Sequence, residues 1–298
     1  VKKLSDWKVG NFITHNTDTV ETNSLDREGW ALVSPDLKPA YGQILSQSVS
    51  LEAIVGNDNI YNGIQTSANS TYIFIPKTED ATYYTFENEK VTWKIEKEFT
   101  RPYFKTAGGT ANLYTYRPFK PNARVIYPYH LVNGNLEFYS LAEIQASFPE
   151  AYSYLMHYKS VLAAESRSIE PEPTTPNEWH RYGRNQALIS CEVPAKLIVG
   201  VLSQGDKYAI DFYQTLISSG GTAGYCMITL PKGASYSIYY IQALLNSKYL
   251  EWFSAIYGEV FRGGYIARGT KILKRLPIRS IDFTDQNQKQ FHDKIAET

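Results

Sequence analysis

The stretch Lys196-Leu197-Ile198-Val199-Gly200-Val201 decides the fold class, because its run of apolar and β-branched residues predicts a strand. Two more strands are predicted closely behind it, over residues 208–211 and 225–230. A long helix is then predicted from Ser237 to Tyr257, where apolar residues recur on one face. Strands that are grouped together, with helices appended to them, predict an α+β fold.

The region before this stretch is also predicted to contain mainly strands. Residues 81–86 and 91–95 are rich in β-formers and flank a polar turn, which predicts a hairpin. Further strands are predicted at residues 72–75, 124–129 and 136–139. We therefore expect mixed, mostly antiparallel twisted sheets, with the helices packed against them.

A helical segment interrupts these strands. Ser140 and Glu143 have the spacing of a capping box, and apolar residues follow at helical intervals. Pro149 has no N–H to donate, so we expect two helices there rather than one. A last amphipathic helix is predicted after Thr284.

Composition narrows the class of protein. The chain has 30 basic and 30 acidic residues, so its zero net charge argues against a generic DNA-coating protein but allows one basic face. Cys191 and Cys226 lie far apart in apolar surroundings, which predicts buried free thiols and a reducing, cytoplasmic setting. No apolar run is long enough for a membrane span, and Val1 to Trp7 does not resemble a signal peptide. Both ends resemble cuts in a longer polypeptide, with a short native protein as the alternative.

Motifs for catalysis are absent from the sequence. It has no phosphate-binding Gly-rich loop with Lys-Ser/Thr and no Gly-x-Ser-x-Gly elbow, and its histidines are scattered. The cluster Gly220-Gly221-Thr222-Ala223-Gly224 lies between two predicted strands, which favours a flexible loop over a cofactor cradle. Glu96 and Glu98 flank Lys97, a pattern that metal-dependent nucleases share but that is common by chance.

Two stretches are basic and contain no Asp or Glu: residues 101–130 and 260–280. Such segments on a neutral chain fit phosphate binding on one face, and solvated surface loops are the alternative. Residues 261–269 mix arginine, glycine and aromatic side chains, which suits a close approach to a polyanion. Residues 179–186 offer Arg, Asn and Gln, the side chains that read the edges of bases.

Four stretches of the chain, taken in order, carry a family resemblance: Asn62 to Phe74, Ile126 to Leu155, Trp179 to Val199 and Ala243 to Ile278. They resemble the C-terminal specificity domain of TaqI-like DNA adenine methyltransferases, which also occurs in type IIG restriction enzymes. The first is similar to the family's Gly-Ile-x-Thr-Gly-x-Asn, although Ser67 stands where the family has glycine. The resemblance covers roughly residues 1–280.

This resemblance implies a target recognition domain that reads double-stranded DNA over residues 1–235, with a helical C-terminal part over 236–298 packing on it. The family's methylation motif, Asn-Pro-Pro-Tyr or its Asp variant, is absent here. The resemblance therefore implies a reader without a catalytic centre. A preceding methyltransferase domain of the same polypeptide would bind S-adenosylmethionine, flip an adenine out of the duplex and methylate its exocyclic amine.

The candidate DNA-binding residues follow from charge, loop position and the resemblance, with no catalytic or metal-binding candidate among them. They are Gln65, Thr66, Asn69, Arg101, Lys105, Arg117, Arg181, Arg184, Gln186, Ser219, Thr222, Arg262, Tyr265, Arg268, Lys271 and Lys274.

Several of these candidates have a structural alternative. The loop from Gln65 to Asn69 could cap the next strand, Arg184 could form an ion pair, and Lys274 could lie on a solvated face. At the level of the whole chain, the rival functions are a specificity subunit of a type I restriction system and a carbohydrate- or protein-binding module. The first rival lacks the expected heptads and second recognition half. The second is motivated by the 24 tyrosines and the neutral charge.

Overall fold

The computed structural model describes residues 33–105, 120–189, 193–204, 208–220 and 224–297. Its strands are β1 (Ser48–Ser50), β2 (Ile60–Asn62), β3 (Ile73–Phe74), β4 (Thr78–Glu79), β5 (Tyr83–Asn88), β6 (Val91–Glu96), β7 (Thr100–Tyr103), β8 (Ala123–Ile126), β9 (Tyr129–Val132), β10 (Asn135–Phe138), β11 (Lys196–Gly200), β12 (Leu202–Ser203), β13 (Ala209–Asp211), β14 (Tyr225–Ile228), β15 (Val260–Phe261), β16 (Tyr265–Ala267) and β17 (Pro277–Arg279). Its α-helices are α2 (Lys38–Ser46), α3 (Leu51–Val55), α4 (Asn69–Tyr72), α5 (Leu141–Ser147), α6 (Pro149–His157), α7 (Lys159–Leu162), α8 (Ile238–Leu245), α9 (Lys248–Tyr257), α10 (Thr270–Arg275) and α11 (Gln286–Ala296). The fold is α+β, and its named strands pair in antiparallel fashion, as predicted.

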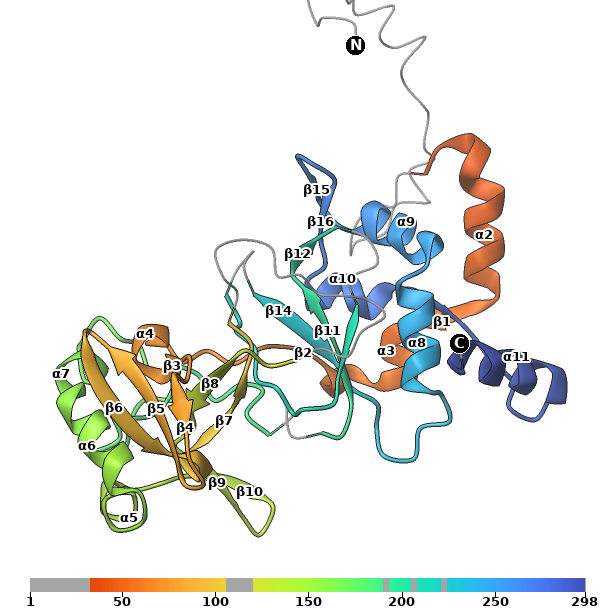
Figure 1. Ribbon diagram of the computed structural model, residues 1–298. Helices are drawn as coiled ribbons and strands as arrows, with labels where there is room; N and C mark the ends of the chain where they lie inside the picture. Colours follow the sequence, from red (N-terminus) through yellow and green to blue (C-terminus); the bar gives the residue numbers. More distant parts are fainter. Residues whose placement is uncertain (1–32, 106–119, 190–192, 205–207, 221–223, 298) are drawn as a thin grey trace, which may run out of the picture.

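A four-stranded sheet with the order β13-β11-β14-β2 lies at the centre of the molecule (Figure 1). Successive side chains of a strand point to opposite faces, so each face collects every second residue. Ile198 and Met227 join one hydrophobic core on one face, while Leu197 and Cys226 join a second core on the other. Leu197, Ile198 and Val199 of β11 are all apolar because both faces of the sheet are covered, and the buried Lys196 before them is paired with Asp211 at 2.6 Å.

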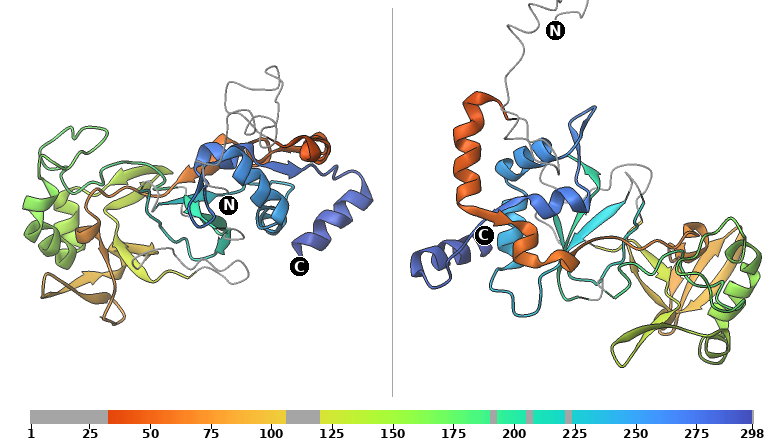
Figure 2. Two further views of the ribbon diagram at one scale, coloured as in Figure 1. Left: turned by 90° about the horizontal axis from the view of Figure 1, so that it is seen from above. Right: turned by 180° about the vertical axis from the view of Figure 1, so that it is seen from behind.

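The two cores divide the chain unequally. Residues 63–195 are called the insert lobe, and those of them that the structure describes contribute buried side chains only to the first core. Residues 33–62 and 196–297, which we call the base lobe, supply the whole second core and the central sheet. Figure 1 shows the insert lobe on the left and the base lobe on the right, and Figure 2 shows them from above and from behind. The boundary predicted after residue 235 does not coincide with this division of the cores, and the functional division made there stays a prediction.

The insert lobe confirms several of the local predictions made for its sequence, whereas Tyr72, expected in a strand, ends helix α4. The hairpin is β5–β6, and Ser140 and Glu143 form a complete capping box at the start of α5. Pro149 begins a second helix, α6, whose first N–H groups are also capped. The buried carboxylate of Glu96 accepts hydrogen bonds of 2.9 Å from the backbone of both Glu150 and Ala151. Glu96 therefore has a structural role that a helix N-terminus explains.

One helix prediction in the base lobe is wrong. The single helix expected from Ser237 to Tyr257 is broken into α8 and α9. The hydroxyl of Ser247 accepts a hydrogen bond of 3.3 Å from the N–H of Leu250 and so caps a new helix. Beside it, the amide of Asn246 accepts from the backbone N–H of Tyr208 and donates to its carbonyl, at 2.9 and 3.1 Å. The helix therefore breaks at the point where Asn246 is hydrogen-bonded to Tyr208, the residue that precedes β13.

Three further features complete the base lobe. The segment expected to be an Arg- and Gly-containing loop forms a hairpin, β15–β16, which pairs with β12. The helix predicted after Thr284 is confirmed as α11, with Asp285 as its cap and His292 buried against Tyr240. Cys226 is a buried free thiol, as predicted, and burial raises its pKa to about 12, while Cys191 lies outside the described residues. No helix in the described ranges is both long and apolar enough to cross a membrane.

Candidate nucleic-acid interface

Three segments that were singled out separately in the sequence meet at the join between the lobes. The backbone of Gln65 bridges to that of Arg184, with the N–H of Arg184 donating to the carbonyl of Gln65 at 3.1 Å. The N–H of Ser219 donates to the carbonyl of Ile64 at 2.7 Å. The side-chain amide of Gln186 donates to the carbonyl of Gly63 at 2.7 Å. Four predicted residues from three distant parts of the chain therefore lie together.

Two glycines allow this close approach. A Cβ added to Gly63 would lie 2.2 Å from the carbonyl oxygen of Ile217. A Cβ added to Gly183 would lie 1.9 Å from the hydroxyl oxygen and 2.6 Å from the Cβ of Ser67. Real Cβ contacts do not come so close, so any larger residue would push the segments apart.

Arg167, which sequence reasoning missed, holds these segments from inside. Its side chain is 9% exposed, and its guanidinium donates to the backbone carbonyls of Leu162, Trp179, Thr66 and Arg181. It also lies over the ring of Tyr72, 5.6 Å from the centroid. A fixed fork of donors suits a cluster of converging carbonyls. No local pattern around Arg167 distinguishes it from a surface arginine.

The loop after Gln65 has a structural role, although it leads into a helix and not directly into the strand that it was expected to cap. Thr66 is 1% exposed, and its hydroxyl donates to the side-chain oxygen of Asn69 at 2.6 Å and accepts from the N–H of Ala68 at 3.1 Å. This arrangement forms the turn that leads into α4. Gln65 is half-buried and Asn69 is exposed, so these two side chains remain accessible.

Arg181 is buried and paired. Its guanidinium lies 2.6 Å from the carboxylate of Glu178, and each side chain is 6% exposed. Burial by itself would raise the pKa of Glu178. Hydrogen bonds from Thr174, Arg181 and Thr175 outweigh that effect and lower this pKa to about 2. The Arg181 guanidinium is therefore committed to the interior of the insert lobe.

Arg184 has the ion pair that was considered for it, but it stays accessible. Its guanidinium is 2.9 Å from the carboxylate of Glu170, and the two side chains are 30% and 58% exposed. Because a solvated pair of this kind contributes little to stability, the arginine can exchange its partner for a phosphate or a base at small cost.

The basic segment 260–280 likewise contains both a buried, paired arginine and exposed cations. Arg268 is 1% exposed, donates to the hydroxyl of Ser203 at 2.9 Å and pairs with the carboxylate of Glu251. By contrast, Arg262 lies exposed at the tip of the β15–β16 hairpin, and Lys271 is exposed on α10.

Two other predicted residues of this segment are half-buried. They are Tyr265 on β16 and Lys274 on α10, whose ammonium bonds to Asn57 and lies 3.8 Å from the carboxylate of Glu52.

Backbone hydrogen bonds connect the first group of segments to the second. The N–H of Tyr225 donates to the carbonyl of Ser218 at 3.0 Å, and the N–H of Val201 donates to that of Gly224 at 2.9 Å. The N–H of Arg268 then donates to the carbonyl of Val201 at 2.6 Å. The predicted segments, linked through residues 201–204, thus form one hydrogen-bonded band, which we call the loop strip: residues 63–69, 183–186, 216–220, 201–204 and 260–268.

The other candidates lie beside this strip or outside the described residues. Lys105 is exposed and follows Phe104, whose N–H donates to the carbonyl of Leu216 at 3.0 Å. Arg101 is half-buried and lies over the ring of Tyr127, where it lines a cavity of about 130 Å³. Two candidates, Arg117 and Thr222, fall in residues that the structure does not describe.

Within the described ranges, no group of three or more His, Cys, Asp or Glu side chains has the geometry to hold a metal ion. Glu96, one of the pair considered for nuclease chemistry, caps α6. The arrangement offers accessible amides, hydroxyls and cations on a rigid backbone, which are groups that bind anions and base edges.

Comparison with known proteins places this geometry in context. No family model matches the chain. The chain is 48% identical over 297 residues to the type II restriction enzyme and methyltransferase RM.Eco57I of Escherichia coli. The match covers 99% of this chain but 30% of that enzyme, so the chain spans about a third of the length of its relative. Over nearly its whole length, the chain is therefore homologous to one region of a restriction and modification enzyme.

Proposed function

We propose that this chain is the DNA-reading region of a restriction–modification enzyme, and that it recognises a specific sequence in duplex DNA through the loop strip. The observation that carries the proposal is the convergence of Gln65, Arg184, Gln186 and Ser219 into one hydrogen-bonded surface. If these residue types occurred in the three segments by chance, we would expect the segments to lie apart in the fold. The homologous enzyme, whose name combines restriction and methylation, supports the same conclusion.

Burial separates two roles among the candidate residues. Those that are exposed or half-buried are proposed to touch DNA: Gln65, Asn69, Arg101, Lys105, Arg184, Gln186, Ser219, Arg262, Tyr265, Lys271 and Lys274. Thr66, Arg181 and Arg268 are proposed to position the loops, because their polar groups are used inside the protein. Cations on the rim would set the register on the phosphates, and the amides and Arg262 would contact the bases.

In this proposal the chemistry belongs to another region of the parent enzyme. That region would bind S-adenosylmethionine and methylate a flipped adenine, while this chain would hold the surrounding duplex. The chain's zero net charge fits such a division of labour, because contact is confined to one band and the second region would complete the grip.

The tyrosines, which motivated a carbohydrate- or protein-binding module, favour the proposal indirectly. Ten of the tyrosines in the described ranges are buried, and several of their hydroxyls donate to backbone carbonyls, as in the bonds from Tyr72 to His180 and from Tyr127 to Leu188 at 2.8 and 2.9 Å. Buried tyrosines of this kind support the fold and offer no stacking surface to a sugar.

The test is selection of a random duplex pool on the full chain at low and moderate salt. We expect one sequence to be enriched, with an affinity that falls as salt rises by about 0.9 log unit per log unit for each phosphate neutralised. Arg184→Ala should weaken binding or relax the selected sequence. Lys289→Ala, which removes an exposed cation of α11 outside the loop strip, should leave both unchanged. A folded chain that binds no duplex at low salt, or binds all sequences equally, would overturn the proposal.

A further inference from the structure

The hairpin β15–β16 is an outlying part of the base lobe, and Figure 1 shows it extending away from the sheet and the helices. Val260 pairs with Ile266, and Phe261 pairs with Tyr265. The three residues between them are Arg262 and two glycines with φ values of +84° and +78° at Gly263 and Gly264. Because this left-handed backbone favours glycine, the turn is tight and Arg262 is its one long side chain.

Hydrogen bonds hold the hairpin at its base and at its turn. The N–H of Ala267 donates to the carbonyl of Glu259 at 2.9 Å at the base, and the side-chain amide of Gln204 donates to the carbonyl of Gly263 in the turn at 2.6 Å. Arg268, directly after β16, anchors the second strand through its buried bonds to Ser203 and Glu251. An element that is ordered before binding does not lose conformational entropy when it binds.

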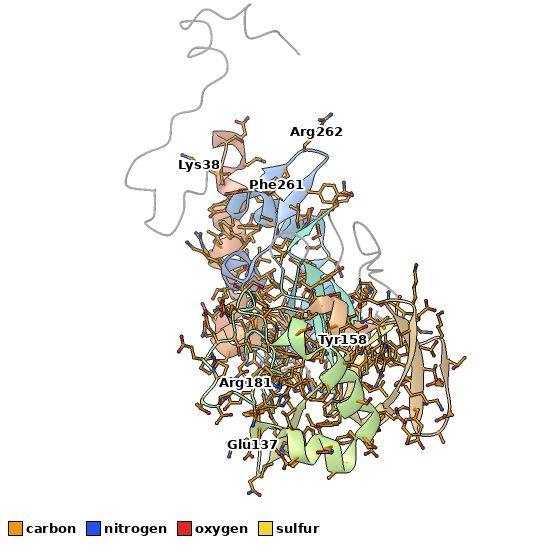
Figure 3. All side chains as sticks on the ribbon, turned by 90° about the vertical axis from the view of Figure 1, so that its left-hand side faces the viewer. Lys38, Glu137, Tyr158, Arg181, Phe261 and Arg262 are labelled. Atoms are coloured by element: carbon orange, nitrogen blue, oxygen red, sulfur yellow. The ribbon has the colours of Figure 1, made fainter. Side chains whose placement is uncertain are left out.

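The apolar side chains near the tip are left partly exposed by the part of the chain that the structure describes. Val260 and Phe261 are 61% and 41% exposed, although both are apolar. Figure 3 shows Arg262 at the outer end of the hairpin, pointing away from the body of the protein. The segment from Val260 to Ser280 contains no acidic residue, and Glu259 at the base of the hairpin is the nearest acid in sequence. An apolar hairpin with a cationic tip is suited to enter a groove that has negative charges along its rims and some apolar groups on its floor.

We infer that this ribbon enters the major groove of the duplex and that Arg262 reads a guanine there; this inference rests on the proposed function. The two residues of β15, Val260 and Phe261, span about 7 Å, and the long side chain of Arg262 in the turn extends this reach to the floor of a groove about 8.5 Å deep. Two strands about 4.8 Å apart, with their side chains, fit a groove about 12 Å wide but not a minor groove of about 6 Å. The guanidinium can donate to both N7 and O6 of guanine, while Phe261 contacts a neighbouring thymine methyl group.

An alternative occupant of the ribbon is a strand from a protein that pairs with the open edge of β15. That edge is two residues long, so it offers few backbone hydrogen bonds, and it gives Arg262 no role. The cationic tip and the rigid base favour DNA. The test is designed so that protein pairing would appear as a negative result.

The probe is the duplex enriched by selection on the wild-type chain, with each guanine in turn replaced by 7-deazaguanine, which lacks the major-groove N7. At one guanine we expect the wild type to lose about 10-fold or more in affinity. Arg262→Ala should show a similar loss on the unmodified duplex and no further loss at that guanine. Arg262→Lys should recover part of the affinity, and Lys289→Ala should behave as the wild type.

Two results would overturn the inference while leaving the proposed function intact. One is an Arg262→Ala chain that binds the enriched duplex as tightly as the wild type, which would also be the outcome if β15 pairs with a protein. The other is a weakened Arg262→Ala chain that keeps the wild-type penalty at every guanine, which would mark a phosphate contact. If no sequence is enriched at all, the proposed function fails first. Circular dichroism of each variant confirms that the fold is retained.

Discussion

Replacing Arg167 by methionine tests how the loop strip is held together. The guanidinium is 9% exposed and donates to four backbone carbonyls: Leu162, Trp179, Thr66 and Arg181. A hydrogen bond to a charged group contributes about 1.5–3 kcal/mol, and a buried acceptor left without a donor costs about 1–3 kcal/mol. Methionine fills much of the volume and removes the cost of burying a charge, which offsets part of the loss. We expect the free energy of unfolding to fall by about 3–5 kcal/mol, a large share of the usual total.

The assay is urea unfolding followed by tryptophan fluorescence, since Trp93 and Trp179 lie in the insert lobe. Arg184→Met is the matched control. It removes an arginine of the same region whose pair with Glu170 is solvated, and it should cost no more than about 1 kcal/mol. If Arg167→Met costs less than about 1 kcal/mol, or no more than its control, the carbonyl cluster does not depend on the guanidinium and the reasoning is refuted.

Three shorter predictions concern other parts of the fold. Gly63→Ala should destabilise the chain by more than about 2 kcal/mol because its Cβ would strike the carbonyl of Ile217, whereas Gly269→Ala, with open space around it, should change the melting temperature little. The pKa of Glu178 is lowered to about 2, so its contribution to stability is complete above about pH 5 and is lost as the pH falls towards 2; Glu178→Gln should flatten the acid limb of a stability–pH curve, and an unchanged limb would contradict this. Ser140→Ala should cost about 1 kcal/mol in urea unfolding through loss of the α5 cap, and a cost near zero would show that the cap is replaced by water.

Local patterns predicted those elements whose causes are local. The hairpin of β5 and β6, the capping box at Ser140 and the helix start at Pro149 each depend on residues within a few positions of one another. The break between α8 and α9 was missed because the apolar period continues across it. Ser247 caps the new helix locally, and the bonds between Asn246 and Tyr208, which lies 38 positions earlier in the chain, depend on the tertiary fold.

The candidate site was predictable in its segments but not in the exposure of its side chains. Because Arg181 and Arg268 lie in loop-like sequence, they were expected to face solvent. Each is instead buried and forms an ion pair with an acidic side chain. Glu178 stands three positions before Arg181, a spacing that could have indicated the pair. Glu251 lies on a different element, in a helix predicted as core, so its pairing with Arg268 depends on the tertiary fold.

The shared central sheet has a consequence for how such proteins can exchange parts. Residues 63–195 leave the base lobe after β2 and return at β11, so they could be replaced as a single cassette with two crossover points. The cassette nevertheless packs on a face of the sheet supplied by Ile198, Ala209 and Met227 of the base lobe. A graft of residues 63–195 between related chains should therefore fold only when the sheet residues that it packs against are transferred together with it.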